Sequence, residues 1–276
     1  MTDFQVWRAQ MAAILRLELK KTLFSRRGWW IYLLAAGPPL ITFLHSVHVM
    51  NRGRAYCSVG EDGMVYATMF QLFYLRAVIF FGCLGIFSNL FRGEVLARTL
   101  HYYFLSPVRR EVLMAGKYLA GLIAAVLLFG GSAVLAFIGL FLHFGPGFQE
   151  FLWRGQGFTQ MLTYLGVTVL GVVGYGAVFL LTGLMFRNPM IPAAVVLVWE
   201  GINNFVPELL QKISVIFYLK SLCPVPVPLR GPLALIAVIG EPVPAWLAVP
   251  GLLLVVFFVL FYAAARARRM EVSYTE

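Results

Sequence analysis

Long apolar stretches constrain this chain more than any other feature of its sequence. Residues 246–265, WLAVPGLLLVVFFVLFYAAA, run for a full bilayer crossing without one charged side chain. A membrane-spanning helix needs about 20 such residues. The chain as a whole is 61% hydrophobic and 12% charged, whereas a soluble domain averages roughly 45–50% and about 25%. Transmembrane barrels show short alternating segments instead, so the sequence predicts an all-α integral membrane protein.

Six segments have the composition of membrane spans, and we predict six transmembrane helices in a single domain covering residues 1–276. Residues 4–24 precede them and combine apolar and basic positions at helical spacing, which predicts an amphipathic helix in the membrane interface. Residues 206–244 are broken by prolines, and we expect a short amphipathic helix at 208–222 followed by external or re-entrant pieces. The predicted spans are 29–49, 67–90, 118–143, 159–186, 190–205 and 246–265.

The distribution of basic residues predicts the orientation. With six spans and an internal N-terminus, fifteen of the 22 lysine and arginine residues fall on the inside and six on the outside, and Arg76 is left within a span. Basic residues accumulate on the cytoplasmic side of membrane proteins. The net charge of +10 therefore indicates topology and not nucleic-acid binding. We expect a multi-pass protein of the plasma membrane, in a bacterium the inner membrane, with both termini in the cytoplasm.

One internal loop, residues 92–117, is more patterned than a linker needs to be. An apolar stripe at helical spacing runs from residue 95 to residue 104, and Pro107 disfavours helix in the residue before it. Ser106 is placed to cap a second helix that begins at Pro107 and runs into the third span. From the residues alone, two interpretations stay open: a structured element that transmits force, or a solvated loop whose arginines only fix the topology.

The same loop resembles that of type-2 ATP-binding-cassette exporter permeases. The pattern E-x(3)-R-T-L-x(5)-S-P-V-x-R-x(5)-G-K spans residues 94–117. Arg98 stands where glycine is usual in that family, and His101 where glutamate is usual. The layout of the whole chain is also similar, with an interfacial helix first, six spans, and a broken external segment before the last span.

This resemblance implies a function and a set of residues. The loop would hold a coupling helix seated in a groove of a cytoplasmic ATPase, and the N-terminal helix would pack nearby. Two ATPase subunits would drive two permease subunits, a homodimer or a heterodimer, between inward-facing and outward-facing states. The residues assigned to ATPase coupling are Glu94, Arg98, Thr99, Leu100, Ser106, Pro107, Val108, Arg109, Arg110 and Lys117.

Motifs for catalysis or nucleotide binding are absent from the sequence. No GxxxxGK[ST] phosphate-binding loop occurs, so ATP and Mg²⁺ are expected to bind a partner chain. No HExxH or GxSxG pattern occurs either, and we predict a non-catalytic subunit without cofactors or metal. The alternatives are an intramembrane enzyme and a scaffold that binds an ATPase without transport. The substrate is not specified, although a lipid-like one would suit the apolar spans.

Polar residues inside predicted spans are the candidates for a translocation path. Glu200 lies in the fifth span, Asn203 and Asn204 follow it, and Arg76 lies in the second. Intramembrane charges usually face a cavity or a partner. Two interpretations of Glu200 stay open: a residue on the path, or a structural residue that forms an ion pair with Arg76 or lies near the outer interface.

Histidines and cysteines give weaker signals. His45 and His48 lie one helical turn apart, which is too few ligands for a metal site, and interfacial polar contacts are the preferred interpretation. Cys57 and Cys223 lie in predicted loops, where a disulfide between them and two unpaired thiols both stay open.

Overall fold

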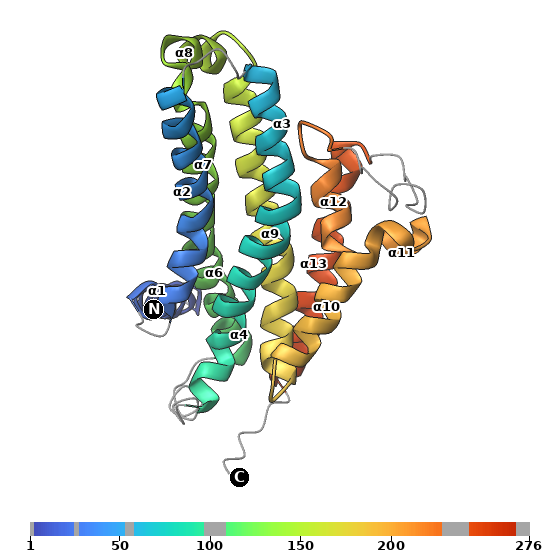
Figure 1. Ribbon diagram of the computed structural model, residues 1–276. Coiled ribbons are helices and arrows are strands. Elements are labelled where there is room, and N and C mark those ends of the chain that lie inside the picture. The colour runs from blue at the N-terminus through green and yellow to red at the C-terminus, as the bar shows by residue number, and fades with distance from the viewer. Residues whose placement is uncertain (1–2, 25–27, 53–57, 97–108, 228–242, 269–276) are drawn as a thin grey trace.

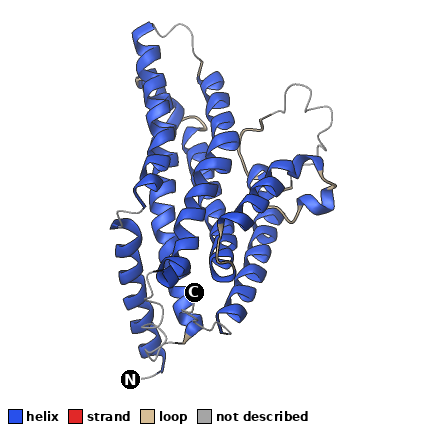
Figure 2. Ribbon diagram, turned by 60° about the horizontal axis from the view of Figure 1, so that its bottom comes forward, coloured by secondary structure: helices blue, strands red, loops and turns tan. Residues whose placement is uncertain are grey.

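The computed structural model describes residues 3–24, 28–52, 58–96, 109–227 and 243–268. Every regular element in these ranges is helical (Figures 1 and 2). The long elements form an upright bundle, with the N-terminal helix α1 at one end and the short helix α8 at the other (Figure 1). The elements in chain order are α1 (Asp3–Phe24), α2 (Trp29–Arg52), α3 (Val59–Met69), η3 (Phe70–Ile79), α4 (Phe80–Leu96), α6 (Arg110–Ala125), η4 (Val126–Gly130), α7 (Gly131–Phe141), η5 (Leu142–Phe144), α8 (Pro146–Trp153), α9 (Gly157–Met185), α10 (Met190–Ile202), η6 (Asn203–Phe205), α11 (Glu208–Gln211), α12 (Val215–Ser221) and α13 (Ala245–Arg268).

Five helical stretches in the described ranges are long and apolar enough to cross a membrane. They are Trp29–Asn51, Val59–Glu94, Arg110–Phe144, Gly157–Met185 and Ala245–Arg268. The predicted interfacial segment also forms a helix, α1. The fifth predicted span differs, because α10 has 13 residues and is therefore about 20 Å long. That is shorter than the ~30 Å hydrocarbon core of a bilayer.

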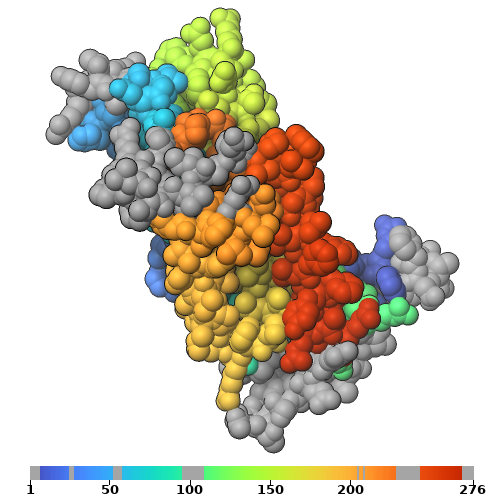
Figure 3. Space-filling view, turned by 90° about the vertical axis from the view of Figure 1, so that its right-hand side faces the viewer, coloured from blue at the N-terminus to red at the C-terminus, as the bar shows by residue number. Residues whose placement is uncertain are grey.

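The segment after α10 folds differently from the prediction. The expected single amphipathic helix at 208–222 is wrong, because the chain breaks into α11 and α12. Helix α12 packs against α9 and α13, and five consecutive residues from Val215 to Leu219 are buried. Figure 3 shows α10 to α12 lying beside α13 on one face of the molecule. An amphipathic surface helix would leave one side exposed, so α12 is part of the core.

Two predicted loops contain helical turns. Helix α3 begins at Val59, within the expected loop 50–66, because Ser58 and Glu61 form a reciprocal capping box. A serine followed three residues later by glutamate is a sequence signal for a helix start, so this end was predictable. The short helix α8 follows Gly145, whose φ of 57° favours glycine, and begins with Pro146 in its first turn.

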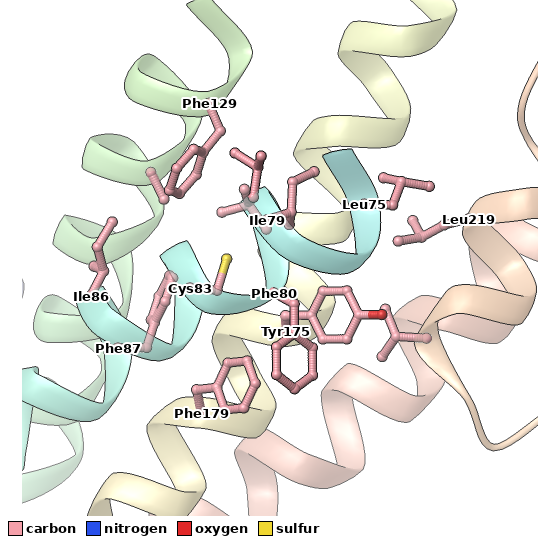
Figure 4. Packing of buried hydrophobic residues seen from close by; sticks show 14 of the residues in the cluster. Leu75, Ile79, Phe80, Cys83, Ile86, Phe87, Phe129, Tyr175, Phe179 and Leu219 are labelled. Carbon is pink, nitrogen blue, oxygen red and sulfur yellow. The ribbon is translucent and has the colours of Figure 1, made fainter. Parts of the chain in front are cut away.

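Aromatic packing between α4 and α9 forms the centre of the bundle (Figure 4). The ring of Phe80 packs edge-on against Phe179, with centroids 4.9 Å apart, and against Tyr175 at 5.4 Å. Of the five aromatic side chains between residues 70 and 81, Phe70, Tyr74 and Phe80 are buried, whereas Phe73 and Phe81 are exposed. Most of these rings therefore serve helix packing.

Gly183 sets how closely α9 approaches α4. A methyl group at this position would lie 2.8 Å from the Ser88 carbonyl oxygen and 2.9 Å from its Cα. Backbone atoms of a packed helix cannot move aside without shifting the helix, and overpacking costs about 1–3 kcal/mol. We expect Gly183→Ala to lower the thermal unfolding midpoint of the purified protein in detergent.

Gly166 on the same helix provides the control, because a methyl group there meets nothing within 4 Å. Gly166→Ala should leave the midpoint unchanged or raise it, since alanine is the better helix former. Equal midpoints for the two variants would contradict close packing at Gly183.

Candidate functional site

Four charged side chains meet where α1 crosses the ends of α4 and α6. The Lys117 ammonium group lies 2.7 Å from Glu18 and 2.8 Å from Glu94, and it also donates a hydrogen bond to the Leu90 carbonyl at 3.0 Å. Lys21 contacts Glu94 at 2.8 Å. We call Glu18, Lys21, Glu94 and Lys117 the charged junction. Two carboxylates and two ammonium groups alternate in it.

Three of the four side chains of the charged junction are buried although it lies at one end of the bundle. The side chain of Lys117 is 0% exposed, and those of Glu18 and Glu94 are 2% exposed. The ammonium group also lies 5.5 Å from the centre of the Phe91 ring. Buried charges persist only when they are paired and hydrogen-bonded. The junction therefore holds α1, α4 and α6 together at this end.

Apolar contacts beside the junction bring α1 still closer to α6. A methyl group at Gly116 would lie 2.8 Å from Ile14, so glycine allows the close approach. Ile14 forms a small buried cluster with Val112 and Leu113 of α6. The N-terminal helix is thus seated against α6 by charge and by packing.

The two arginines that precede α6 contact other elements. The Arg109 guanidinium lies 5.2 Å from the centre of the Trp7 ring on α1, a cation–π geometry. Arg110 donates a hydrogen bond to the Arg268 carbonyl of α13 at 2.9 Å, and Arg268 pairs with Glu111 at 2.5 Å. The end of the last helix is therefore joined to the start of α6.

The remaining residues assigned to ATPase coupling lie outside the described residues, and so do residues 97–104 of the predicted helical stripe. They are Arg98, Thr99, Leu100, Ser106, Pro107 and Val108. Glu94 precedes the undescribed residues near the end of α4, Lys117 follows them in α6, and both side chains belong to the junction. Sequence reasoning missed their partners Glu18 and Lys21. The available signal was Glu18, the single acidic residue between residues 4 and 24.

A second polar cluster lies inside the bundle around Glu200. Its carboxylate accepts hydrogen bonds from the Ser214 hydroxyl at 2.6 Å and from the backbone N–H groups of Val215 and Ile216 at 3.0 Å each. The Tyr175 hydroxyl of α9 also interacts with it. The side chain thereby caps the N-terminus of α12 and binds α10, α12 and α9 to one another.

Cationic groups accompany this cluster. Arg76, in the π-helical segment η3, interacts electrostatically with Tyr175 and with Lys220 of α12. In the part of the chain that the structure describes, the Nε atom of Arg76 is buried without a hydrogen-bond partner. Of the other candidates, Asn203 is buried, and its Oδ1 has no hydrogen-bond partner within the same residues. The side chain of Asn204 lies outside the described part. The structure thus brings Arg76 to the same region as Glu200.

Of the two cysteines considered for a disulfide, only Cys223 is described. Its thiol donates to the Leu219 carbonyl at 3.4 Å, and Cys57 lies outside the described residues.

Comparison with known proteins identifies the family. No curated protein matches the chain. A family profile described as "ABC-2 family transporter protein" matches residues 14–202, which is more than half of the 276 residues. The match begins within α1, includes the charged junction and the loop between α4 and α6, and ends at the last residue of α10. The chain therefore belongs to the ABC-2 family of transporter proteins and is a multi-pass membrane permease.

Proposed function

We propose that this permease is half of the membrane part of an exporter, driven by separate ATPase subunits that dock on the loop of residues 92–117. ATP and Mg²⁺ bind to those subunits, and a second permease subunit, identical or related, completes the membrane part. The plasma membrane is the site of action. The charged junction is the observation that carries this proposal, because it lies at both ends of the docking segment.

The junction gives a physical route for coupling. A force applied to the loop of residues 92–117 reaches Glu94 near one end and Lys117 at the other. Removing either from its partner would leave a charge buried without compensation, which costs about 3–5 kcal/mol. Helices α1, α4 and α6 therefore move as one body when an ATPase shifts the loop, and the motion passes along α4 to the Arg76 and Glu200 region.

The topology in this proposal has six crossings, with both termini in the cytoplasm. Helix α10 starts at the same end as the junction, and α12, whose first N–H groups bind Glu200 of α10, continues toward the other end (Figure 1). Together they form one broken crossing, which brings α13 back to the cytoplasm. Discontinuous helices are tolerated at membrane depth where side chains satisfy the freed backbone groups, as Glu200 does.

The translocation path in this proposal runs beside the broken crossing. Arg76 and Asn203 offer polar groups there, and Asn204 stays a candidate as the next residue in the sequence. Glu200 is held by α12 and shapes the path without contacting the cargo. A substrate with a polar head and an apolar body would match this mixture. Its identity is to be found by transport assays on the complete complex.

Charge reversal at the start of α6 tests the coupling. In the double variant Arg109→Glu, Arg110→Glu, and after deletion of Ser106–Pro107, we expect the protein to insert normally and ATP hydrolysis to lose its link to transport. The physical reason differs between the two variants. The reversed charges repel the docking groove, and the deletion changes the direction of the segment. The measurement compares ATPase activity with substrate efflux in proteoliposomes, after mass spectrometry of the proteins that copurify.

Arg154 supplies the matched control, because it is an exposed arginine at the opposite end of the bundle. Arg154→Glu should keep both the copurified ATPase and the coupling. The absence of any ATPase from the purified complex would overturn the proposal. An ATPase that binds without any transport would support the scaffold alternative.

A further inference from the structure

A buried carboxylate and two imidazoles meet at the end of the bundle opposite the charged junction. Asp62 lies in the first turns of α3 and is 3% exposed at its side chain. Its Oδ2 is 3.2 Å from Nε2 of His143 in η5, and its Oδ1 is 3.7 Å from Nε2 of His45 in α2. Three separate elements therefore supply one cluster, which the proposed transport function does not use.

The tautomer of His143 follows from its other contacts. Its Nδ1 lies 2.9 Å from the Leu140 carbonyl oxygen, and a carbonyl can only accept a hydrogen bond. The Ser46 hydroxyl lies 3.2 Å from Nδ1, and its one hydrogen is directed to the Gly139 and Leu140 carbonyl oxygens, at 2.6 and 2.9 Å. Nδ1 of His143 therefore carries a hydrogen.

A neutral imidazole has only one N–H, so Nε2 of His143 would then present a lone pair to Asp62. Two acceptors would face each other at 3.2 Å in a buried site. In the described residues, neither Nε2 of His143 nor Oδ2 of Asp62 has a hydrogen-bond partner. Adding one proton, on either atom, turns this repulsion into an ion pair or a neutral hydrogen bond.

From this geometry we infer that Asp62 and His143 form a proton-binding site that holds one proton more than a carboxylate and a neutral histidine. The groups that act on Asp62 electrostatically are His143 from η5, His45 from α2 and its neighbour Glu61. Under the proposed topology the site faces the outside. Only this orientation rests on the proposed function, and the proton-binding site itself does not. Acidity outside the cell would then tighten the packing of α2, α3 and η5.

A proton accounts for the site better than a metal ion does. The described residues contain no group of three or more His, Cys, Asp or Glu side chains placed to hold a metal ion. The chain contains four histidines, so their protonation states can be read individually.

The test is NMR of the full chain in nanodiscs, with ¹⁵N-labelled histidine and ¹³C-labelled aspartate, between about pH 6 and pH 9. We expect the pair to hold one proton at pH values where a histidine of an unfolded chain, with an ordinary pKa near 6.5, is already neutral. It appears either as a His143 imidazolium or as a protonated Asp62 carboxyl. Neutral His143 together with ionised Asp62 at pH 7 would overturn the inference. A His143 or Asp62 resonance that shifts when a chelator is added would also overturn it, because it would mean that a metal ion is bound there.

Asp62→Asn is the matched variant, because its amide donates a hydrogen bond to neutral Nε2 without any extra proton. In the native protein the unfolding equilibrium constant should rise up to about tenfold per pH unit above ~6.5, since the folded pair binds one proton more than the unfolded chain. The variant should fold and lose this slope. His48→Gln, an exposed histidine of α2, should keep it. Identical slopes in all three proteins would also overturn the inference.

Discussion

Lys117→Met will destabilise the folded protein by about 3–5 kcal/mol, the cost of leaving a buried charge without its partner. Methionine fills a similar volume but supplies no charge, so Glu18 and Glu94 would face each other in a site from which water is excluded. We expect a large fall in the thermal unfolding midpoint in detergent, and detachment of α1 that makes its residues accessible to protease.

Two further variants separate charge from packing. Lys21→Met removes a partner of Glu94 whose side chain is 51% exposed, and exposed pairs contribute roughly 0–1 kcal/mol, so its effect should be small. The triple variant Glu18→Gln, Glu94→Gln, Lys117→Met removes the uncompensated charges and should recover part of the loss. A Lys117→Met protein as stable as the native one would contradict the buried junction.

Glu200→Ala is the second large effect that we expect. Loss of the Glu200 carboxylate leaves the Ser214 hydroxyl and the N–H groups of Val215 and Ile216 without an acceptor inside the bundle. An unsatisfied buried donor costs about 1–3 kcal/mol, and three are affected. Helix α12 should therefore loosen from α9 and α13 while α10 itself stays helical.

Cys223, two residues beyond α12, reports on this loosening. In a Cys57→Ser, Cys83→Ser background, maleimide labelling of Cys223 should be several times faster in Glu200→Ala than in the parent. Glu200→Gln keeps one acceptor oxygen and should give an intermediate rate. Val198→Ala, at an exposed position of α10, should match the parent. A labelling rate that does not depend on residue 200 would mean that another contact holds α12.

The loop motif identified the family and two of the four junction residues, but it did not indicate their environment. The assignment of Glu94 and Lys117 to ATPase coupling rests on the resemblance of residues 94–117 to the family's loop. In the structure Lys117 pairs with Glu94 and with Glu18, whose position 76 residues before Glu94 gives no local signal of contact. Pairings over such separations are set when helices pack, and one sequence does not encode them in a readable pattern.

The capping box at Ser58 and Glu61 shows the opposite case. Its signal is local, because a serine followed three residues later by glutamate predicts a helix that starts at Val59. The division of 208–222 into α11 and α12 had no such signal, because the cap is Glu200, on a different helix. A predicted amphipathic surface helix thus became part of the core once a distant carboxylate satisfied its first N–H groups.

The sequence by itself determined that this chain is a helical membrane protein. Segments of about 20 apolar residues are long enough to cross a bilayer, and a helix satisfies all the backbone N–H and C=O groups of such a segment within the segment itself. It also determined the family, through the residues around the loop. Only the tertiary structure decided which polar side chains are paired. Where lipid surrounds the helices, buried charges must find partners on neighbouring helices, and the packing of α1, α4 and α6, and of α9, α10 and α12, selects them.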